Sequence, residues 1–345
     1  MAILTTPNLR QYFFPSTHKY DRPFNFSNFN KYILMPDIKD GGRYGNVFFR
    51  VASLFGIGKQ LDRIACLDRT FSDKFRSEFN TVFPNLHNYV LLENCWTDKV
   101  KSVAFHNEIW NYIYESTLEQ YADEERISLN TGVLECFRFF HRFRQEIIKM
   151  FEFSVSFKQK IDKLAKEVFK DDTSPKICAH IRRSDFFGGA HPLLPTTEPF
   201  TSKALDYLVT TVSNNVKVDK VSLLLFNDDA DFTNEVADQV KKNCHVKNIF
   251  MTKFKPIDDM GLAIRHCDYF LLTSSGSTFG WWMAYLLPDN KQHNVFYNSL
   301  LFKKEFEHVI RLFREEEFFP AEWNRLVWEN NQIFMQDRSI PAFIV

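Results

Sequence analysis

The stretch ICAHIRRSDFFGG, residues 177–189, begins as an apolar strand and ends in a cluster of charged side chains. Arg182 and Arg183 follow the strand directly, with His180 before them and Asp185 after them. A guanidinium group offers a planar fork of donors and keeps its charge at any working pH, so two arginines at a strand end suit a diphosphate. A pair of surface arginines salt-bridged to Asp185 explains this stretch equally well.

Apolar strand patterns and amphipathic helix patterns alternate around this stretch. The expected strands are KICAHI, VSLLLFN, KNIFM, DYFLLTS and NVFYN. The expected helices between them are TSKALDYLVTTV, DFTNEVADQVKK, IDDMGLAIRH and GWWMAYLL, with Thr201 and Asp231 as N-caps of the first two. Continuous apolar strands that alternate with helices indicate a parallel sheet covered on both faces. We therefore expect a doubly wound α/β domain over about residues 172–315.

The first half of the chain shows a similar but less regular pattern. Strands are expected at KYILMP, RIACLD, YVLLENCW and SVAFH. A helix is expected after KYILMP, because Phe48, Val51, Ala52 and Phe55 recur at helical spacing. A helical tract over about residues 139–168 joins the two halves. Two Rossmann-like halves predict a cleft between them, with ligands bound beyond the carboxyl ends of the strands.

The stretch SSGSTFGWW, residues 274–282, is a second candidate for anion binding. It follows the strand DYFLLTS and begins a helix whose free N–H groups could hold an anion. Gly276 and Gly280 allow a tight turn, and Ser277 and Thr278 are candidate caps. An ordinary strand–turn–helix explains this stretch equally well by itself. A positive helix end and two arginines, all at strand ends of one domain, together favour phosphate binding.

The junction GGRYGN, residues 41–46, takes the corresponding position in the first half. Its glycines permit close approach of the backbone to a ligand, although a plain turn is an equal alternative. It matches neither a Walker loop nor G-x-G-x-x-G, which argues against ATP and nucleotide redox chemistry.

The stretch FNDDADF contains the Asp-x-Asp pattern, here Asp229 and Asp231, that holds a divalent metal in some sugar transferases. Because it follows a strand and begins a helix, capping is the simpler interpretation. Asp228 or Asp229 could also hydrogen-bond a base or a ribose.

Composition excludes several classes of protein. The 43 basic and 43 acidic residues give no net charge, which argues against nucleic acid or an anionic membrane as a whole-surface partner. Six cysteines occur without a CxxC pair, so no zinc finger is expected, and four of them lie in apolar runs that favour buried free thiols. Neither a run of about 18 apolar residues nor a signal peptide is visible, so we expect a soluble cytosolic protein or an anchor missing from this chain.

Five segments of the chain match one set of motifs. They are, in chain order, GGRYGNVFFRVASLFGIGKQ, LECFRFFHRFRQEI, HIRRSD, SSGSTFGWWMAYLL and EEEFFPAEW, and they span about residues 40–323. Together they resemble the α-1,2-fucosyltransferase family, glycosyltransferase family 11. HIRRSD resembles the H-x-R-R-x-D motif that this family shares with α-1,6-fucosyltransferases and protein O-fucosyltransferases. Tyr44, Val47 and Ser184 depart from the commoner residues at their positions.

The resemblance implies a GT-B fold, in which two Rossmann-like, doubly wound α/β domains face a cleft. Residues 1–168 would form the N-terminal domain on the acceptor side, and residues 169–345 the C-terminal domain that binds GDP-fucose, with a tail that crosses back. The implied reaction is inverting transfer of L-fucose from GDP-β-L-fucose to the 2-hydroxyl of a terminal galactose on a glycan, without a metal. The family's membrane anchor implies the lumenal face of the Golgi membrane, whereas a chain without one implies the cytoplasm.

The resemblance also assigns residues to the site. Arg182, Asp185 and His180 are the catalytic candidates, of which we expect His180 and Asp185 to orient the arginines. The donor-binding candidates are Arg182, Arg183, Asn46, Gly45, Asp228, Ser275, Ser277, Thr278 and Phe279. No metal-binding residue is expected, and no catalytic base is assigned.

Two other functions remain open on the sequence. A protein O-fucosyltransferase shares the H-x-R-R-x-D motif, although the segment STFGWWMAYL argues against it. The second is a catalytically inactive protein that binds a GDP-sugar or a glycan, although the intact Arg182 and Arg183 argue against loss of the donor site.

Overall fold

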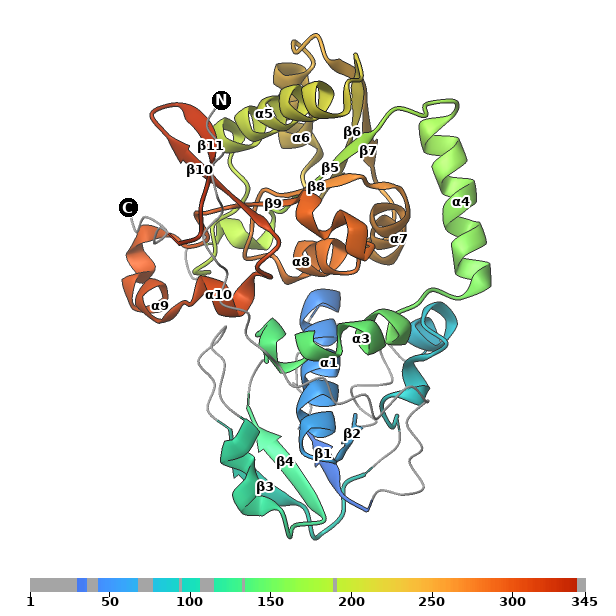
Figure 1. Cartoon of the computed structure of the whole chain (residues 1–345), viewed down its shortest axis with the longest axis vertical. Coiled ribbons are helices and arrows are strands. Elements are labelled where there is room, and N and C mark those ends of the chain that lie inside the picture. Colours follow the sequence, from blue (N-terminus) through green and yellow to red (C-terminus); the bar gives the residue numbers. More distant parts are fainter. Residues whose placement is uncertain are drawn as a thin grey trace, which may run out of the picture.

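The computed structural model describes residues 30–35, 43–67, 77–92, 95–105, 115–131, 134–188 and 191–339. These residues form two α/β halves, each built on a mainly parallel sheet (Figure 1). The first sheet has the order β2-β1-β4-β3, and all its strand pairs are parallel. Its strands are β1 (Tyr32–Leu34), β2 (Ile64–Cys66), β3 (Lys101–Ala104) and β4 (Arg126–Asn130), and α1 (Tyr44–Gln60) contacts β1 and β2.

The second sheet has the order β11-β10-β9-β8-β5-β6-β7, and only the β10–β11 pair is antiparallel. Its strands are β5 (Lys176–Ile181), β6 (Val221–Asn227), β7 (Val246–Thr252), β8 (Tyr269–Leu272), β9 (Val295–Asn298), β10 (Asn324–Glu329) and β11 (Gln332–Gln336). Its main helices are α5 (Glu198–Val216), α6 (Ala230–Val240), α7 (Pro256–His266) and α8 (Thr278–Tyr285).

The two faces of the second sheet belong to different hydrophobic clusters. Ala179 and Ile181 of β5 pack with residues of α5 and α6, whereas Cys178 packs with residues of α7 and α8. Helices therefore cover both faces, as in a doubly wound sheet. Two such α/β halves make up the GT-B fold, and the predicted fold class is confirmed.

The expected helical tract over residues 139–168 is broken into shorter pieces. They are the 3-10 turns η4 (Phe137–Phe139) and η5 (His141–Phe143), then α3 (Arg144–Met150) and α4 (Val155–Phe169). Helix α4 packs against α7 of the second half. Two short helices, α9 (Glu307–Leu312) and α10 (Glu315–Phe318), precede β10, and α10 contacts η4 of the first half.

The two predicted N-caps are wrong. Helix α5 begins three residues before Thr201, at Glu198, and carries a proline in its first turn, where the fixed φ of proline suits a helix start. Asp229 rather than Asp231 caps α6, because its carboxylate accepts the backbone N–H of Phe232. The capping role expected for the Asp-x-Asp stretch is therefore confirmed for its first aspartate.

Eight of the nine expected strands are confirmed, and one is wrong. In YVLLENCW only Leu91 pairs, in an isolated parallel bridge with Cys66, and residues 93–94 lie outside the described residues. The patterns also do not predict β4, β10 and β11. These strands carry charged or amide side chains in place of a continuous apolar run, such as RISLN in β4 and QIFMQ in β11.

The two halves share one hydrophobic core. Phe48 and Phe49 of α1 lie against Trp282 and Trp281 of α8, with ring centroids 5.5 and 4.6 Å apart. Phe140 of the first half stacks on Trp282 at 5.4 Å. All five rings are buried, and the cluster that contains them continues into both halves. The junction between the halves is therefore a packed interior. Its aromatic pairs stabilise it beyond what burial alone provides.

Arg144 of α3 fixes the carboxyl end of α8. Its guanidinium donates to the backbone oxygens of Tyr285 (2.7 Å) and Leu287 (3.1 Å) and to the carboxylate of Asp289 (3.0 Å). A cation at this end of a helix satisfies its free carbonyls and opposes the helix dipole. The first half therefore holds the orientation of α8 within the second half.

Disulfide bonds join Cys66 to Cys95 and Cys178 to Cys267. The prediction of buried free thiols is therefore wrong where a cysteine of an apolar run forms one of these two bonds, whereas Cys136 is buried, takes part in neither bond and donates its thiol to the backbone oxygen of Glu317 at 3.1 Å. An apolar run predicts burial for free and bonded cysteines alike, so the sequence pattern could not separate them.

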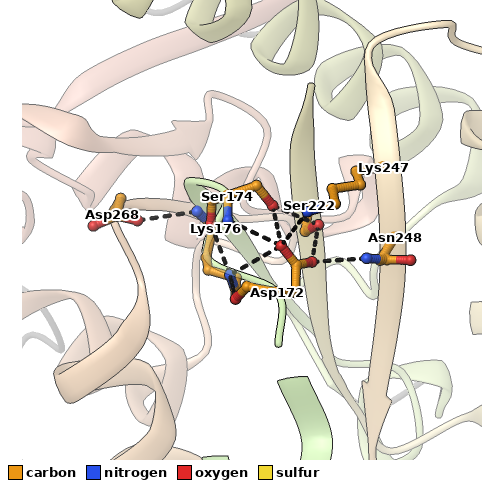
Figure 2. A network of polar contacts seen from close by, with 7 residues as sticks. All are labelled: Asp172, Ser174, Lys176, Ser222, Lys247, Asn248 and Asp268. Atoms are coloured by element: carbon orange, nitrogen blue, oxygen red, sulfur yellow. Dashed lines mark hydrogen bonds and ion pairs between the residues drawn. The ribbon is translucent and has the colours of Figure 1, made fainter. Parts of the chain in front are cut away.

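Asp172 ties together the amino ends of three strands in the second sheet (Figure 2). One carboxylate oxygen accepts from the backbone and hydroxyl of Ser174, at 2.9 and 2.5 Å, and from Lys247 at 3.2 Å. The other accepts from Ser222 at 2.5 Å and Asn248 at 2.8 Å. Burial alone would raise the pKa of Asp172, but these hydrogen bonds outweigh burial and hold it far below its usual range.

We predict that Asp172→Asn lowers the free energy of unfolding by about 2–3 kcal/mol at pH 7, because an amide cannot accept all these donors. The carboxylate pKa is depressed in the folded state, so its contribution is full above the unfolded pKa and is lost as pH falls below about 4. Urea unfolding of both proteins between pH 7 and pH 3 measures this. The exposed neighbour Asp171, changed to Asn, is the control. Equal losses in both variants would contradict the prediction.

Candidate functional site

The amino ends of α1 and α8 meet at Gly45. A Cβ atom at Gly45 would lie 2.4 Å from the backbone N of Phe279 and 2.5 Å from the carbonyl carbon of Thr278. No side chain fits there, so the contact between the two helices requires glycine. The close approach predicted for this junction is thus made to the backbone of α8, while Gly41 and Gly42 lie outside the described residues.

A hydrogen bond reinforces this contact between the halves. The hydroxyl of Thr278 donates to the side-chain oxygen of Asn46 at 2.6 Å. Because α1 follows β1 and α8 follows β8, the carboxyl ends of these strands face each other across the contact. Two positive helix ends converge there, at the strand ends where parallel sheets bind ligands.

The predicted serines of this turn are buried rather than open to solvent. The hydroxyl of Ser275 donates to the backbone oxygen of Leu272 at 3.1 Å. Ser277 holds the N-cap position of α8, but its side chain makes no capping hydrogen bond. Phe279, which is half-buried, lies between Tyr44 at 6.3 Å and His180 at 5.9 Å.

Arg182 lies directly beyond β5 and is held by two carboxylates. Its guanidinium pairs with Asp185 at 2.5 Å and with Asp228 at 2.8 Å. The ion pair with Asp185 is the one that the alternative interpretation expects, but Arg182 makes it without Arg183 and is only 16% exposed rather than on the open surface. Two short, charge-assisted contacts fix the position of its positive charge.

Arg183 has a different set of partners. It donates to the carboxylate of Asp229 at 2.9 Å and to the backbone oxygen of Thr196 at 2.7 Å. Its guanidinium also lies 3.8 Å from the ring centre of Phe232 and 4.4 Å from that of Phe187. Arg183 therefore packs against the start of α6, while its neighbour Arg182 does not.

Asp228, at the end of β6, shapes the turn that carries both arginines. It accepts the backbone N–H of Arg183 at 2.9 Å and the hydroxyl of Ser184 at 2.7 Å, in addition to its ion pair with Arg182. These contacts give Asp228 a structural role beside any contact with a base or ribose. In the part of the chain that the structure describes, no group of acidic, histidine or cysteine side chains could hold a metal ion.

Asp185 connects the two halves. Besides Arg182 it pairs with Arg43, which immediately precedes α1, at 3.3 Å. Contacts thus run without a break from Arg182 through Asp185 and Arg43 to the meeting point of α1 and α8. Arg43 was not predicted as a site residue, although its presence in the junction GGRYGN was the available signal.

His180 is buried beneath this cluster, 6% exposed, at the end of β5. Burial lowers its pKa to about 4, against a smaller opposite effect of Asp228. A Cβ atom at Gly280 would lie 2.6 Å from Nδ1 of His180, and within the described ranges this nitrogen has no hydrogen-bond partner. His180 therefore packs, uncharged at neutral pH, against α8 and helps set the position of the strand end.

We predict that His180 makes stability depend on pH. Its folded pKa of about 4 lies below the unfolded value, so the unfolded chain binds the extra proton as pH falls, and stability declines. Between pH 7.5 and pH 5 this costs about 2 kcal/mol, and His180→Gln should remove that part of the decline. Urea unfolding at both pH values measures it, with the exposed His308, changed to Gln, as control. An unchanged slope in His180→Gln would contradict the prediction.

The arrangement favours one kind of chemistry. The guanidinium groups of Arg182 and Arg43 and two helix amino ends lie at the carboxyl ends of the sheets, where the carboxylates of Asp185 and Asp228 hold Arg182 and balance part of this positive charge. Such fixed charges bind phosphate groups and stabilise negative charge that develops on a departing phosphate. The structure brings together Arg182, Asp185 and Asp228, and separately Gly45, Asn46 and Thr278.

Several known proteins are similar to this chain. A family model described as Glycosyl transferase family 11 matches residues 5–326. A galactoside 2-alpha-L-fucosyltransferase of Caenorhabditis elegans is 26% identical over 319 residues, which are 84% of this chain and 76% of that protein. Another galactoside 2-alpha-L-fucosyltransferase of C. elegans is 30% identical over 164 residues, or 47% of this chain and 42% of that protein.

Two solved structures also match much of this chain at low sequence identity. An Arabidopsis thaliana FUT1 mutant in complex with GDP has a TM-score of 0.49 and 12% identity, over 76% of this chain and 72% of that chain. POFUT1 in complex with GDP-fucose has a TM-score of 0.46 and 14% identity, over 74% of this chain and 94% of that chain. Separately, no helix among the described residues is long and apolar enough to cross a membrane.

Proposed function

Because the chain belongs to glycosyl transferase family 11, we propose that it is a galactoside α-1,2-fucosyltransferase. It would transfer L-fucose from GDP-β-L-fucose to the 2-hydroxyl of a terminal galactose on a glycan. Its relatives of 26–30% identity that bear this name support the proposal. The observation that carries it is the cluster of Arg182, Arg43 and two helix amino ends at facing strand ends.

In this proposal the second half binds the diphosphate of the donor. The bond between C1 of fucose and the β-phosphate oxygen breaks, and its electron pair leaves with GDP. The 2-hydroxyl oxygen of galactose forms the new bond to C1 from the opposite side and loses its proton. Arg182, held in place by Asp185 and Asp228, stabilises the charge on the departing phosphate without reorganising. We propose that these groups do the work for which other transferases use a metal.

The test is incubation with GDP-fucose and lactose, with GDP release and the fucosylated product measured together. We expect both, in the presence of a chelator as well. A 2-deoxygalactoside, which lacks only the accepting hydroxyl, is the matched control and should give no product. Transfer to a folded peptide domain instead would indicate a protein O-fucosyltransferase. Binding of GDP-fucose without any turnover would indicate an inactive binding protein.

We also propose that the protein acts on the lumenal side of the Golgi membrane. The disulfides Cys66–Cys95 and Cys178–Cys267 support this location, because such bonds persist in oxidising compartments and are rare in the cytosol. Alkylation of denatured protein from intact cells tests it: these four cysteines should react only after reduction. Reaction without reduction, with a cytosolic distribution, would favour the cytoplasm instead.

A further inference from the structure

Strand β11 forms an edge of the second sheet and pairs only with β10. The two strands form a hairpin whose turn residues, Asn330 and Asn331, have positive φ angles of 50° and 61°. Glu329 and Gln332 flank this turn as a pair. Figure 1 shows the hairpin at the side of the sheet, away from the contact between the halves.

The register of the hairpin determines which backbone groups of β11 are free. A two-residue turn of this kind is closed by a hydrogen-bonded pair, and such pairs then alternate along the strands. Gln332, Phe334 and Gln336 therefore direct their backbone groups toward β10. Ile333 and Met335 direct theirs away from it, and within the described ranges no bond to them is found.

The other sheet edges carry features that block pairing with another chain. Strand β7 has the exposed Lys247 and an irregular register with β6, and β3 carries the exposed Lys101. The edge of β2 is covered by Leu91, whose backbone bonds to Ala65 and Leu67. Lysines, bulges and covering segments are the means by which natural sheets avoid edge-to-edge association.

Among the described residues, strand β11 carries no lysine and pairs with β10 in a regular register, and helix α5 packs against it. Its sequence, QIFMQ, contains no charge and no proline, and Phe334 and Met335 are 36% and 54% exposed. The residue types of β11 are also arranged symmetrically about Phe334, with an apolar residue on each side of it and a glutamine at each end. In antiparallel pairing with an identical strand centred there, each glutamine faces a glutamine, Ile333 faces Met335, and Phe334 faces itself.

We propose that the chain forms a two-fold dimer through antiparallel pairing of β11 with β11 of a second copy, centred on Phe334. In this register the outward backbone groups of Ile333 bond with those of Met335 in the second copy. The pairing thus uses the groups that the hairpin leaves free, and it puts no like charges opposite each other. The two sheets become one continuous sheet, an isologous arrangement that closes at two copies.

Sedimentation equilibrium of the full chain, over about 1–100 μM, tests the proposal. We expect a mass twice that of one chain. Phe334→Lys places two lysines opposite each other on the two-fold axis, and Phe334→Glu places two glutamates there. Each variant alone should therefore lose the dimer and show a twofold lower mass, while it still unfolds in one cooperative transition. An equimolar mixture of the two should restore the doubled mass, because lysine then faces glutamate.

Met251→Lys, at an exposed methionine on the opposite edge strand, is the control and should remain dimeric. A single-chain mass for the wild type overturns the proposal, as does a dimer that persists in both charged variants or a mixture that stays monomeric. If the wild type is monomeric and truncation after Ser339 makes it dimeric, residues 340–345 of the same chain occupy the free edge of β11 in place of a second copy.

Discussion

Replacing Arg182 with alanine should lower kcat/KM for fucosyl transfer by about a hundredfold to a thousandfold and leave the protein folded. The reason is the position of its guanidinium, which Asp185 and Asp228 fix at 2.5 and 2.8 Å beyond the end of β5. Loss of one preorganised donor to developing negative charge has this order of effect on rate. Initial rates with GDP-fucose and lactose, together with thermal unfolding, measure both parts.

Arg265→Ala is the matched control. Arg265 also forms short contacts with a carboxylate, at 2.7–3.0 Å from Asp162, but on the outer face of α4 and α7. We expect its turnover to equal that of the wild type. Free guanidinium should partly restore Arg182→Ala, because it supplies the missing charge. Turnover of Arg182→Ala within tenfold of the wild type would remove Arg182 from the mechanism.

Removal of the Cys178–Cys267 disulfide should lower the free energy of unfolding by about 4 kcal/mol. The bond closes a loop with a sequence separation of 89 residues, and the loss of chain entropy in the unfolded state grows with that length. Urea unfolding of the variant Cys178→Ala/Cys267→Ala against the oxidised wild type measures this. A loss of this size is a substantial part of the total free energy of unfolding of an ordinary protein.

Cys244→Ala is the control for this prediction, since Cys244 is free and exposed. Its unfolding should match that of the wild type. A reductant should destabilise the wild type but leave the double variant, which still contains Cys66–Cys95, less affected. Equal stability of the double variant and the oxidised wild type would contradict the role assigned to the bond.

The sequence predicts the central strands β5, β6 and β8 of the second sheet well because they are buried on both faces. KICAHI and VSLLLFN then read as continuous apolar runs, and the charged residues after them mark the strand ends. Arg182, Asp185 and Asp228 could therefore be assigned to one edge of the sheet from the sequence alone. Adjacent residues of an extended chain point in opposite directions, which could also have separated the role of Arg183 from that of Arg182.

Contacts between distant segments could not be predicted in this way. The ion pair of Arg43 with Asp185 and the bond of Cys178 with Cys267 each join parts of the chain that no local pattern relates. The glycines of GGRYGN predicted a close approach, and Gly45 makes one. The sequence did not reveal that the approaching group is the backbone of α8 rather than a ligand. Such partners depend on how the two halves pack.

The aromatic core shared by α1 and α8 limits how this protein can diverge. Phe48, Phe49 and Phe140 lie in one half, and the tryptophans they contact, Trp281 and Trp282, lie in the other. Neither half keeps a closed interior without the other, so the halves are not interchangeable modules. A chimera that takes its first half from a relative therefore inherits a mismatched interior.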